Sequence, residues 1–378
     1  MNTPITPNAG IQLSDQQRVA WLQLIRSENV GPATFRDLIN HFGTATTALE
    51  ALPELASRGN GPKQIKIASQ RQAEQELTRL EKLGGRIICL GEPDYPSALL
   101  ASDGSPPVIS VLGSVQTLSR NAVAIVGSRN SSLSGVKLTK IFARDIAKAD
   151  YVIVSGLARG IDTAAHEASL SRGTVAIFAG GVDHIYPSEN KALADQIIAQ
   201  NGAIISELPL SWKPRAQDFP RRNRIVAGMS LGILVVEAAR RSGSLITARL
   251  ANEMGRLVFA VPGSPLDPRS EGTNGLIKQG ALLVSNADDI LQALEPLSET
   301  NQQASYSLNE EDTKTLFSAE PDASDRSMVL RALNHTPTDI DELIRFTELS
   351  ASTVQIVLLE LALAGRIEHH TGNKVSLI

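Results

Sequence analysis

The sequence AVAIVGSR, residues 122–129, is an uninterrupted apolar run that ends in a glycine, a serine and an arginine. A second run, LGILVV at residues 231–236, is apolar throughout apart from its glycine. Strands of a parallel sheet are buried on both faces, so their sequences are uniformly apolar rather than alternating. These two segments therefore predict central strands of a parallel sheet.

Comparable apolar runs recur on both sides of these segments, at residues 86–90, 151–154, 174–179, 202–205 and 256–261. Segments with helical periodicity lie between the runs, near residues 134–149, 162–172, 188–199, 222–229 and 244–254. Strands that alternate with helices, with glycine at the joints, are typical of a doubly wound α/β fold. We therefore predict a Rossmann-like core with a mostly parallel sheet over residues 84–295.

Helical segments flank this core. Residues 1–83 contain an apolar helical stripe, the turn Asn29-Val30-Gly31-Pro32 and a second amphipathic run, which fits either a helix-hairpin-helix (SAM-like) domain that contacts a DNA backbone or an ordinary helical turn. Residues 296–325 carry seven acids against one lysine and predict a disordered linker. Residues 326–378 predict three helices and a short hairpin, a winged helix that serves either DNA or a protein partner.

Composition narrows the classes of protein. The chain has 378 residues, 42% of them hydrophobic, and its single cysteine excludes an internal disulfide and a cysteine-based metal site. No apolar run is long enough to span a membrane, and the first residues lack the pattern of a secretion signal, so we expect a cytoplasmic protein without a membrane partner. The net charge is -4, yet residues 121–295 sum to about +3, so a nucleic-acid partner is compatible with this composition.

Ligands of open α/β sheets bind at the carboxyl ends of the strands, so the loops that follow the predicted strands are the candidate site. These loops are rich in glycine, whose backbone N–H groups approach an anion closely, and in hydroxyl side chains. Together they predict a phosphate-binding rim, although each loop alone is more often structural. The chain has neither a GxGxxG nor a GxxxxGK[ST] motif, so no nucleotide cofactor is expected. The candidate residues are Gly127, Ser128, Arg129, Ser155, Gly156, Arg159, Gly160, Asp162, Ser242, Gly243, Thr247 and Asn274.

The segment FPRRNRI, residues 219–225, concentrates cations beside an aromatic ring. Pro220 fits the start of a helix near Arg221, and arginines near a helix N-terminus oppose the helix dipole, which is easier to explain if they meet an anion. A phenylalanine beside arginines can stack on a base while the cations bind phosphates. The alternative is a solvated basic loop with its phenylalanine in the core. The candidates here are Arg215, Phe219, Arg221, Arg222, Asn223 and Arg224.

The sequence does not indicate a catalytic centre. His166 lies four residues after Asp162, which suits either an anion contact or an N-cap aspartate with a structurally bonded histidine. Glu207 and Glu237 follow predicted strands as paired carboxylates or, the interpretation we favour, as groups that cap a helix or pair with arginine. No serine has a plausible catalytic histidine and acid, and the histidines show no metal spacing. We therefore expect a binding protein rather than an enzyme.

Taken in order along the chain, these motifs resemble the DNA-processing protein A (DprA/Smf) family. The resemblance covers about 160 residues, and the flanks resemble those of members with a helical N-terminal domain and a C-terminal winged helix. The motifs are VGSR (126–129), SGLARGID (155–162), AAHEASL (164–170), AGGVDHIYPSEN (179–190), ISELP (205–209), FPRRNRIVAGMS (219–230), VVEAARRSGSLITARLANEMGR (235–256), VFAVPGS (258–264) and EGTNGLIKQGA (271–281).

The resemblance implies a homodimer that binds single-stranded DNA without strong sequence preference, protects incoming strands during natural transformation and loads the RecA recombinase. By motif match it assigns DNA contacts to Gly127, Ser128, Arg129, Phe219, Arg222 and Arg224. Many relatives carry a lysine shortly before FPxRNR, and here Arg215 is the nearest upstream cation, so its role is open. Two rival interpretations are a nucleotide hydrolase of the phosphoribohydrolase kind, whose PGGxGTxxE pattern the chain lacks, and an adaptor that acts through the winged helix.

Overall fold

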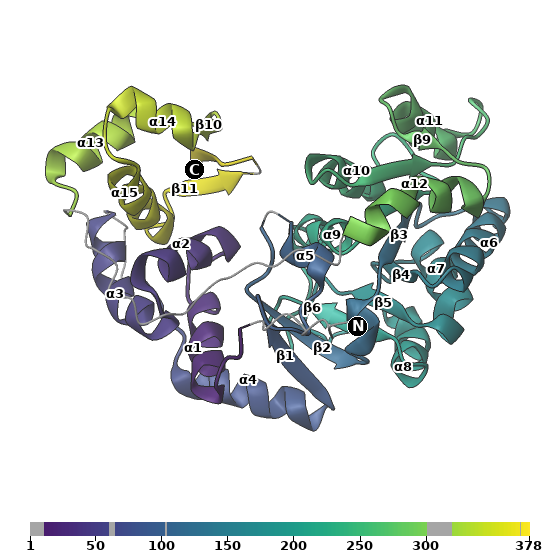
Figure 1. Ribbon diagram of the computed structural model, residues 1–378, viewed down its shortest axis with the longest axis horizontal. Helices are drawn as coiled ribbons and strands as arrows, with labels where there is room; N and C mark the ends of the chain where they lie inside the picture. Colours follow the sequence, from purple (N-terminus) through teal and green to yellow (C-terminus); the bar gives the residue numbers. More distant parts are fainter. Residues whose placement is uncertain (1–10, 60–64, 103, 301–319, 371) are drawn as a thin grey trace, which may run out of the picture. The chain divides into compact units, whose positions relative to one another are not determined.

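The computed structural model describes residues 11–59, 65–102, 104–300, 320–370 and 372–378 (Figure 1). These residues form two compact units. The sheet unit contains the described residues from Thr78 onward to the end of the helix at Thr300. The helical unit combines those between Ile11 and Leu77 with those between Glu320 and Ile378.

The sheet unit is built on nine strands in the order β1-β2-β6-β5-β4-β3-β7-β8-β9. The strands β3 to β9 pair in parallel, whereas β2 pairs antiparallel with both β1 and β6. Chain order runs outward from β3 in both directions, so the predicted doubly wound, mostly parallel core is confirmed. The strands are β1 (Gly85–Cys89), β2 (Val108–Gly113), β3 (Ala122–Val126), β4 (Val152–Ser155), β5 (Thr174–Ile177), β6 (Ala203–Ser206), β7 (Gly232–Val235), β8 (Leu257–Ala260) and β9 (Leu282–Leu283).

Helices cover both faces of this sheet. Phe142 of α6, Ile161 of α7 and Ile290 of α12 join one buried cluster with residues of β3, β4 and β7. Helices α9 and α10 pack against each other and against strands β5, β7 and β8, and none of their residues belongs to that cluster. The helices are α5 (Ser97–Leu100), α6 (Leu133–Lys148), α7 (Ile161–Ser169), α8 (Lys191–Ala199), α9 (Asp218–Gly228), α10 (Gly243–Glu253), α11 (Glu271–Lys278) and α12 (Ala287–Thr300).

The helical unit has a hydrophobic core of its own around its winged helix. Val329 of α13, Leu343 of α14 and Val357 of α15 are buried together in it. The predicted helices and hairpin are present, and the short strand β10 completes a three-stranded sheet. The elements are α1 (Asp15–Ile25), α2 (Pro32–Phe42), α3 (Ala45–Arg58), α13 (Ala323–Ala332), α14 (Ile340–Thr347), α15 (Ala351–Leu363), β10 (Thr338–Asp339), β11 (Ile367–His370) and β12 (Lys374–Leu377); α4 (Gln70–Lys82) leads into the sheet unit.

Two features of the organisation were not apparent from the sequence. The N-terminal and C-terminal flanks, treated as separate domains from sequence, form one unit, because α15 packs against α2 and α3. The two ends of the predicted linker 296–325 are helical, since α12 continues to Thr300 and α13 begins at Ala323. The rest of that linker, residues 301–319, lies outside the described residues.

Along the described part of the chain, no single helix is long and apolar enough to cross a membrane. Helices α14 and α15 meet the length and composition requirement only as a pair bent by 117°.

Candidate nucleic-acid interface

A cavity of about 580 Å³ opens at the carboxyl ends of β3 and β7. Chain order reverses between these two neighbouring strands, and their following loops diverge, which is where doubly wound sheets bind ligands. The loop after β3, the loop after β4, helix α9 and the N-terminus of α10 supply its walls. The lining residues are Val126, Gly127, Ser128, Arg129, Asn130, Gly156, Ala158, Asp162, Phe219, Pro220, Arg222, Asn223, Val226, Ala239, Arg241, Ser242, Gly243, Ser244, Ile246 and Thr247.

The structure brings most of the candidates from the predicted rim together at this cavity and leaves others away from it. Those that do not line it are Ser155, Arg159, Gly160, His166, Arg215, Arg221, Arg224 and Asn274. Sequence reasoning missed Arg241, an exposed cation at the cavity wall. The sequence could have indicated this residue, because two arginines directly precede the Ser-Gly pair at which a helix begins.

Arg222 forms the buried floor of the cavity. Its Nη1 atom donates to the backbone oxygen of Ile177 at 2.8 Å, and its guanidinium lies against Gly156 so closely that a Cβ at that glycine would clash with it. A side chain at position 156 would therefore displace the guanidinium of Arg222 from this place. Arg222 is 6% exposed, so it presents its charge to the cavity from below.

Burial shifts the pKa values of Arg222 and of the neighbouring Asp162. Desolvation, opposed by the charge of Asp162 and assisted by that of Arg129, lowers the pKa of Arg222 to about 10, so the guanidinium stays cationic at neutral pH. Burial raises the pKa of Asp162, opposed by the charge of Arg222 and by backbone N–H groups. The Asp162 carboxylate accepts from the N–H of Gly156 at 3.1 Å and of Ala158 at 3.3 Å. Asp162 therefore shapes the β4–α7 loop, and the expected N-cap position is instead occupied by Gly160.

An aromatic pair and a cation form the mouth of the cavity. The guanidinium carbon of Arg129 lies 5.3 Å from the ring centroid of Phe219, and the ring of Tyr186 meets Phe219 edge-on at 5.6 Å between centroids. Arg129 is exposed, Phe219 is half-buried, and Tyr186 is 52% exposed. Sequence reasoning did not identify Tyr186, although it lies within the motif AGGVDHIYPSEN. The exposed faces of this group can stack on a base while the guanidinium attracts a phosphate.

The N-terminus of α10 closes the opposite wall. Ser242 caps the helix, and its Oγ accepts from the N–H of Ser244 at 3.4 Å. Gly243 is exposed, with no atom within 4 Å of the position that a Cβ would take. An approaching phosphate can therefore reach the backbone N–H groups at the positive end of the helix dipole.

The other arginines near this segment are engaged elsewhere. Arg221 and Arg224 both pair with the buried carboxylate of Glu207, and Arg224 also donates to the backbone oxygen of Gly104. Arg215 pairs with Asp218 and lies over the ring of Trp212 at 4.5 Å. Of the three side chains, that of Arg224 is the most buried, so it is not free to contact a DNA backbone in this structure.

Helix α9 begins at Asp218, three residues before the expected start at Arg221. Pro220 then lies in the first turn, where a missing N–H costs no intrahelical hydrogen bond. The turn consequently presents Phe219 and Asn223 to the cavity, while Ile225 and Met229 are buried.

His166 has a structural role and no access to the cavity. Its Nδ1 atom hydrogen-bonds Thr174 Oγ1 at 2.9 Å, and the side chain is fully buried. Burial, followed by the charge of Arg222, lowers the pKa of His166 to about 3, so the ring is neutral at pH 7. The structure therefore gives His166 the hydrogen-bonded structural role and does not place its ring at the cavity.

Four further candidates also have contacts inside the protein. Ser155 Oγ donates to the backbone oxygen of Ile125 at 2.6 Å and is buried. Arg159 pairs with Glu189, and Asn274 Nδ2 donates to the backbone oxygen of Gly263 at 2.9 Å. Gly160 has φ of +76°, and a Cβ there would clash with the backbone oxygen of Ser128. These residues position the loops rather than line the cavity.

The two carboxylates that follow strands do not form a pair. Glu207 binds arginines, and Glu237 accepts from the N–H of Ser132, the N-cap residue of α6, at 2.9 Å. This is the arrangement that the sequence favoured. Among the described residues, no group of His, Cys, Asp and Glu side chains is arranged to bind a metal ion. The lining residues of the cavity include three arginines and one acid, which makes it a site for an anion.

Comparison with known proteins agrees with this geometry. Three family models match the chain: "DNA recombination-mediator protein A" over residues 86–295, "DprA-like N-terminal HHH domain" over residues 15–78 and "DprA winged helix domain" over residues 314–373. The Protein Smf of Escherichia coli is 38% identical over 314 residues, which cover 82% of each chain. The DNA processing protein DprA of Bacillus subtilis is 41% identical over 242 residues, 61% of this chain and 81% of the relative.

Two solved structures of relatives are similar. The DNA processing protein A of Streptococcus pneumoniae aligns with a TM-score of 0.61 and 33% identity, over 75% of this chain and 98% of that one. The DNA processing protein A of Helicobacter pylori, described with a unique single-stranded DNA binding mode, aligns with a TM-score of 0.51 and 32% identity. That alignment covers 56% of this chain and 96% of that one.

Proposed function

The chain belongs to the family of DNA recombination-mediator protein A, and from this premise we propose that it binds single-stranded DNA in the cavity between β3 and β7. The observation that carries the proposal is the exposed Arg129 held over Phe219, in the cavity that the buried cation Arg222 also lines. A ring with a cation beside it suits a strand whose bases are unpaired, because every base has a face on which it can stack.

The proposed path of the strand follows the charged and polar groups of the lining. Phosphates meet Arg129, Arg241 and the N–H groups of Gly243 and its neighbours, while a base stacks against Phe219. None of these contacts reads a base edge, so binding is expected to depend weakly on sequence. Arg222 contributes its field from the floor and fixes the loop geometry.

The biological role proposed from the family is that of a recombination mediator in the cytoplasm. The protein would protect incoming strands during natural transformation and load the RecA recombinase onto them, without catalysing a reaction of its own. Its support is the match of all three family models along one chain.

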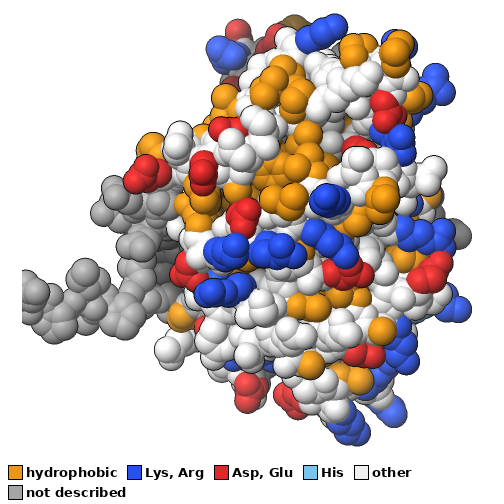
Figure 2. Space-filling view, turned by 90° about the vertical axis from the view of Figure 1, so that its right-hand side faces the viewer, with side chains coloured by type: hydrophobic (Ala, Val, Ile, Leu, Met, Phe, Trp, Pro, Cys, Tyr) orange, Lys and Arg blue, Asp and Glu red, His pale blue; other side chains and the backbone are white. Residues whose placement is uncertain are grey.

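A homodimer is also part of the proposal. Strand β9 ends the sheet, and its residues Leu282 and Leu283 are 43% and 53% exposed. Figure 2 faces the side on which β9, α11 and α6 lie in Figure 1, and it shows hydrophobic side chains gathered above a row of Lys and Arg. An open sheet edge with apolar side chains favours pairing with another chain, and a second copy is the partner we propose.

Fluorescence anisotropy with a labelled oligo-dT strand and a duplex of equal length tests the DNA site. The variant Arg129→Ala/Arg241→Ala removes the two exposed cations of the lining. We expect it to lose roughly 10- to 100-fold in single-strand affinity and to lower the salt slope by about 1.4, since each lost phosphate contact removes about 0.7. Tight binding by the wild type that falls steeply with salt is part of the expected result.

Lys148→Ala is the matched control. This exposed cation is the last residue of α6, a helix that begins on the cavity side of the sheet and runs away from it, so its loss should leave affinity within twofold. Unchanged binding by the double variant would move the site away from the cavity. No strand binding by the wild type, with release of free base from a nucleotide monophosphate, would instead establish the hydrolase alternative.

A further inference from the structure

Helix α15 of the winged helix is apolar on two opposite faces. Its sequence, ASTVQIVLLELAL, contains no lysine or arginine, and nine of its 13 residues are buried. One face, with Val354, Val357 and Leu361 among others, belongs to the core of the winged helix. A second set lies outside that core but repeats at helical spacing along the other side, namely Ile356, Leu359, Glu360 and Leu363.

The second face of α15 packs against the N-terminal helices of the same unit. Helix α15 contacts both α2 and α3, and Gly59, which follows α3, meets α15 backbone to backbone. A Cβ at Gly59 would clash with the backbone oxygen of Glu360 and lie 2.7 Å from Ala364 Cβ. Asn29, in the turn before α2, donates from Nδ2 to the backbone oxygen of Leu363 at 2.9 Å. The contact is therefore close-packed and bonded at both ends.

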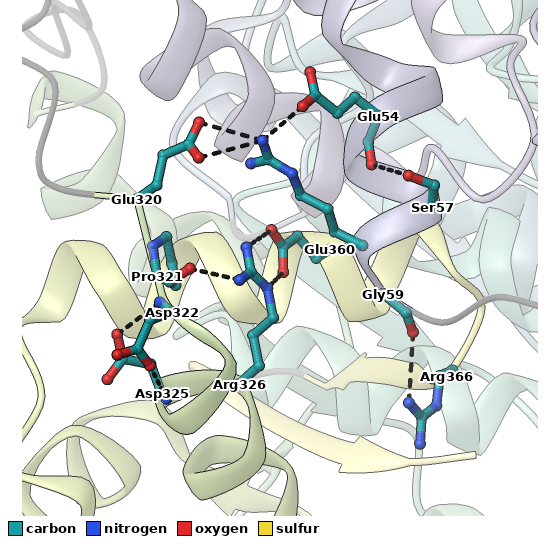
Figure 3. A network of polar contacts seen from close by, with 11 residues as sticks. Glu54, Ser57, Gly59, Glu320, Pro321, Asp322, Asp325, Arg326, Glu360 and Arg366 are labelled. Atoms are coloured by element: carbon teal, nitrogen blue, oxygen red, sulfur yellow. Dashed lines mark hydrogen bonds and ion pairs between the residues drawn. The ribbon is translucent and has the colours of Figure 1, made fainter.

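A polar network joins the start of the winged helix to α15 and to the end of α3 (Figure 3). Arg326 donates from Nε and Nη2 to the two carboxylate oxygens of Glu360 at 2.7 and 2.8 Å. Arg58, at the end of α3, pairs with Glu320 at 3.2 Å, and Arg366 donates to the backbone oxygen of Gly59 at 3.4 Å. The Glu360 side chain is 1% exposed, so its partner Arg326 is what satisfies it.

In helix-turn-helix proteins the recognition helix enters the major groove, and phosphate contacts by cations supply much of the affinity. The third helix of this winged helix has no cation, and its outer face is already covered. We propose that the winged helix is an internal docking module whose partner is the N-terminal helical domain of its own chain rather than duplex DNA. The helical unit thus contains chain segments from before and after the sheet unit.

This inference does not rest on the proposed single-strand site, so either proposal can fail while the other stands. It predicts that the N-terminal helices and α15 protect each other although they are separated by most of the sequence. It also predicts that exposed charges of the winged helix contribute nothing to DNA affinity.

Hydrogen exchange of the full chain, read by mass spectrometry, tests the docking with a matched pair of substitutions. Gly59→Ala places a methyl group against Glu360 and Ala364, whereas Gly31→Ala adds the same group where nothing lies within 4 Å. We expect Gly59→Ala to speed exchange at least tenfold in residues 45–58 and 356–363, and Gly31→Ala to leave both segments within twofold. Equal exchange in the two variants would overturn the proposal.

Duplex binding supplies a second test that requires no change at the packed contact. Arg345 and Lys374 are exposed cations of the winged helix. We expect Arg345→Glu/Lys374→Glu to leave the duplex affinity of the full chain within twofold. A tenfold or greater loss would show that the winged helix binds DNA and would overturn the proposal.

Discussion

Helices α9 and α15 both belong to segments that the sequence offers for contact with DNA, and the structure uses them in opposite ways. Helix α9 carries three arginines, and α15 carries none. Yet Arg222 of α9 is buried, and Arg221 and Arg224 are paired with Glu207, so the exposed cations of the cavity come from the loop residues Arg129 and Arg241. In α15, apolar side chains face protein on two sides.

The difference shows that a count of cations along a helix does not measure its charge toward a ligand. Acids and backbone oxygens from other segments bind the α9 arginines, and of the three only Arg222 lines the cavity. They hold the floor and the loops in place while Phe219 and Asn223 face the opening. Helix α15 has no arginine or lysine, and apolar packing together with the ion pair between Glu360 and Arg326 holds it in place.

The largest effect is expected from the buried cation of α9. Arg222→Met leaves the buried Asp162 carboxylate without the charge that offsets it and Ile177 without its donor. We expect the free energy of unfolding of the sheet unit to fall by about 3–5 kcal/mol. Arg221→Met, at a 43% exposed side chain, should cost less than about 1 kcal/mol. Denaturant unfolding of both variants checks this, and equal losses would mean that Arg222 is not the floor.

A somewhat smaller effect is expected on the outer face of α15. Leu359→Ala removes a buried side chain at the contact with the N-terminal helices and should destabilise the helical unit by roughly 3 kcal/mol. Phe346→Ala, at an aromatic side chain of α14 that is 75% exposed, should change stability by no more than about 0.5 kcal/mol. Thermal unfolding compares the two. Single-strand affinity should stay unchanged in both, and a loss in Leu359→Ala alone would tie α15 to the DNA site.

The smallest effect concerns pH and the buried histidine under the cavity. His166 has a pKa lowered to about 3, so the unfolded chain binds a proton between that value and its usual 6.5 that the folded chain does not. Stability is complete above pH 6.5 and falls as pH decreases, by up to about 1.4 kcal/mol per pH unit from this group. The raised pKa of Asp162 acts in the opposite sense in its own range.

His166→Gln separates the two contributions, because Asp162 is present in both proteins and glutamine does not titrate. Unfolding measured at pH 7, 6 and 5 should show a steeper loss of stability in the wild type than in the variant. Parallel curves would mean that His166 becomes protonated inside the folded protein.

Much of the fold could be predicted because most of its strands are marked by a local run of apolar residues. The runs at 122–126 and 231–236 are apolar at nearly every position, and both are central strands. Strand β2 was missed although Val108–Gly113 is apolar, because it follows Pro106 and Pro107 and its antiparallel pairing with β6 involves distant residues. Strand β9 has two residues, too few for any pattern.

The candidate site was predictable in outline and not in detail. Glycine loops after strands β3 and β4 and before α10 were expected at one edge, and they meet at one cavity. Whether an arginine there can contact a ligand depends on its partners inside the protein. Arg224 is bound by Glu207 and by the backbone oxygen of Gly104, which come from other segments. His166 likewise could be assigned a structural role only after Thr174 was found beside it.

The sequence by itself determined the doubly wound core, the glycine-rich rim and the winged helix, because periodicity and turn chemistry act between residues close along the chain. Only the tertiary structure decided which charges remain exposed and what covers α15. Those outcomes depend on contacts such as Asn29 with Leu363 and Arg222 with Ile177, whose partners are far apart in sequence and leave no local pattern.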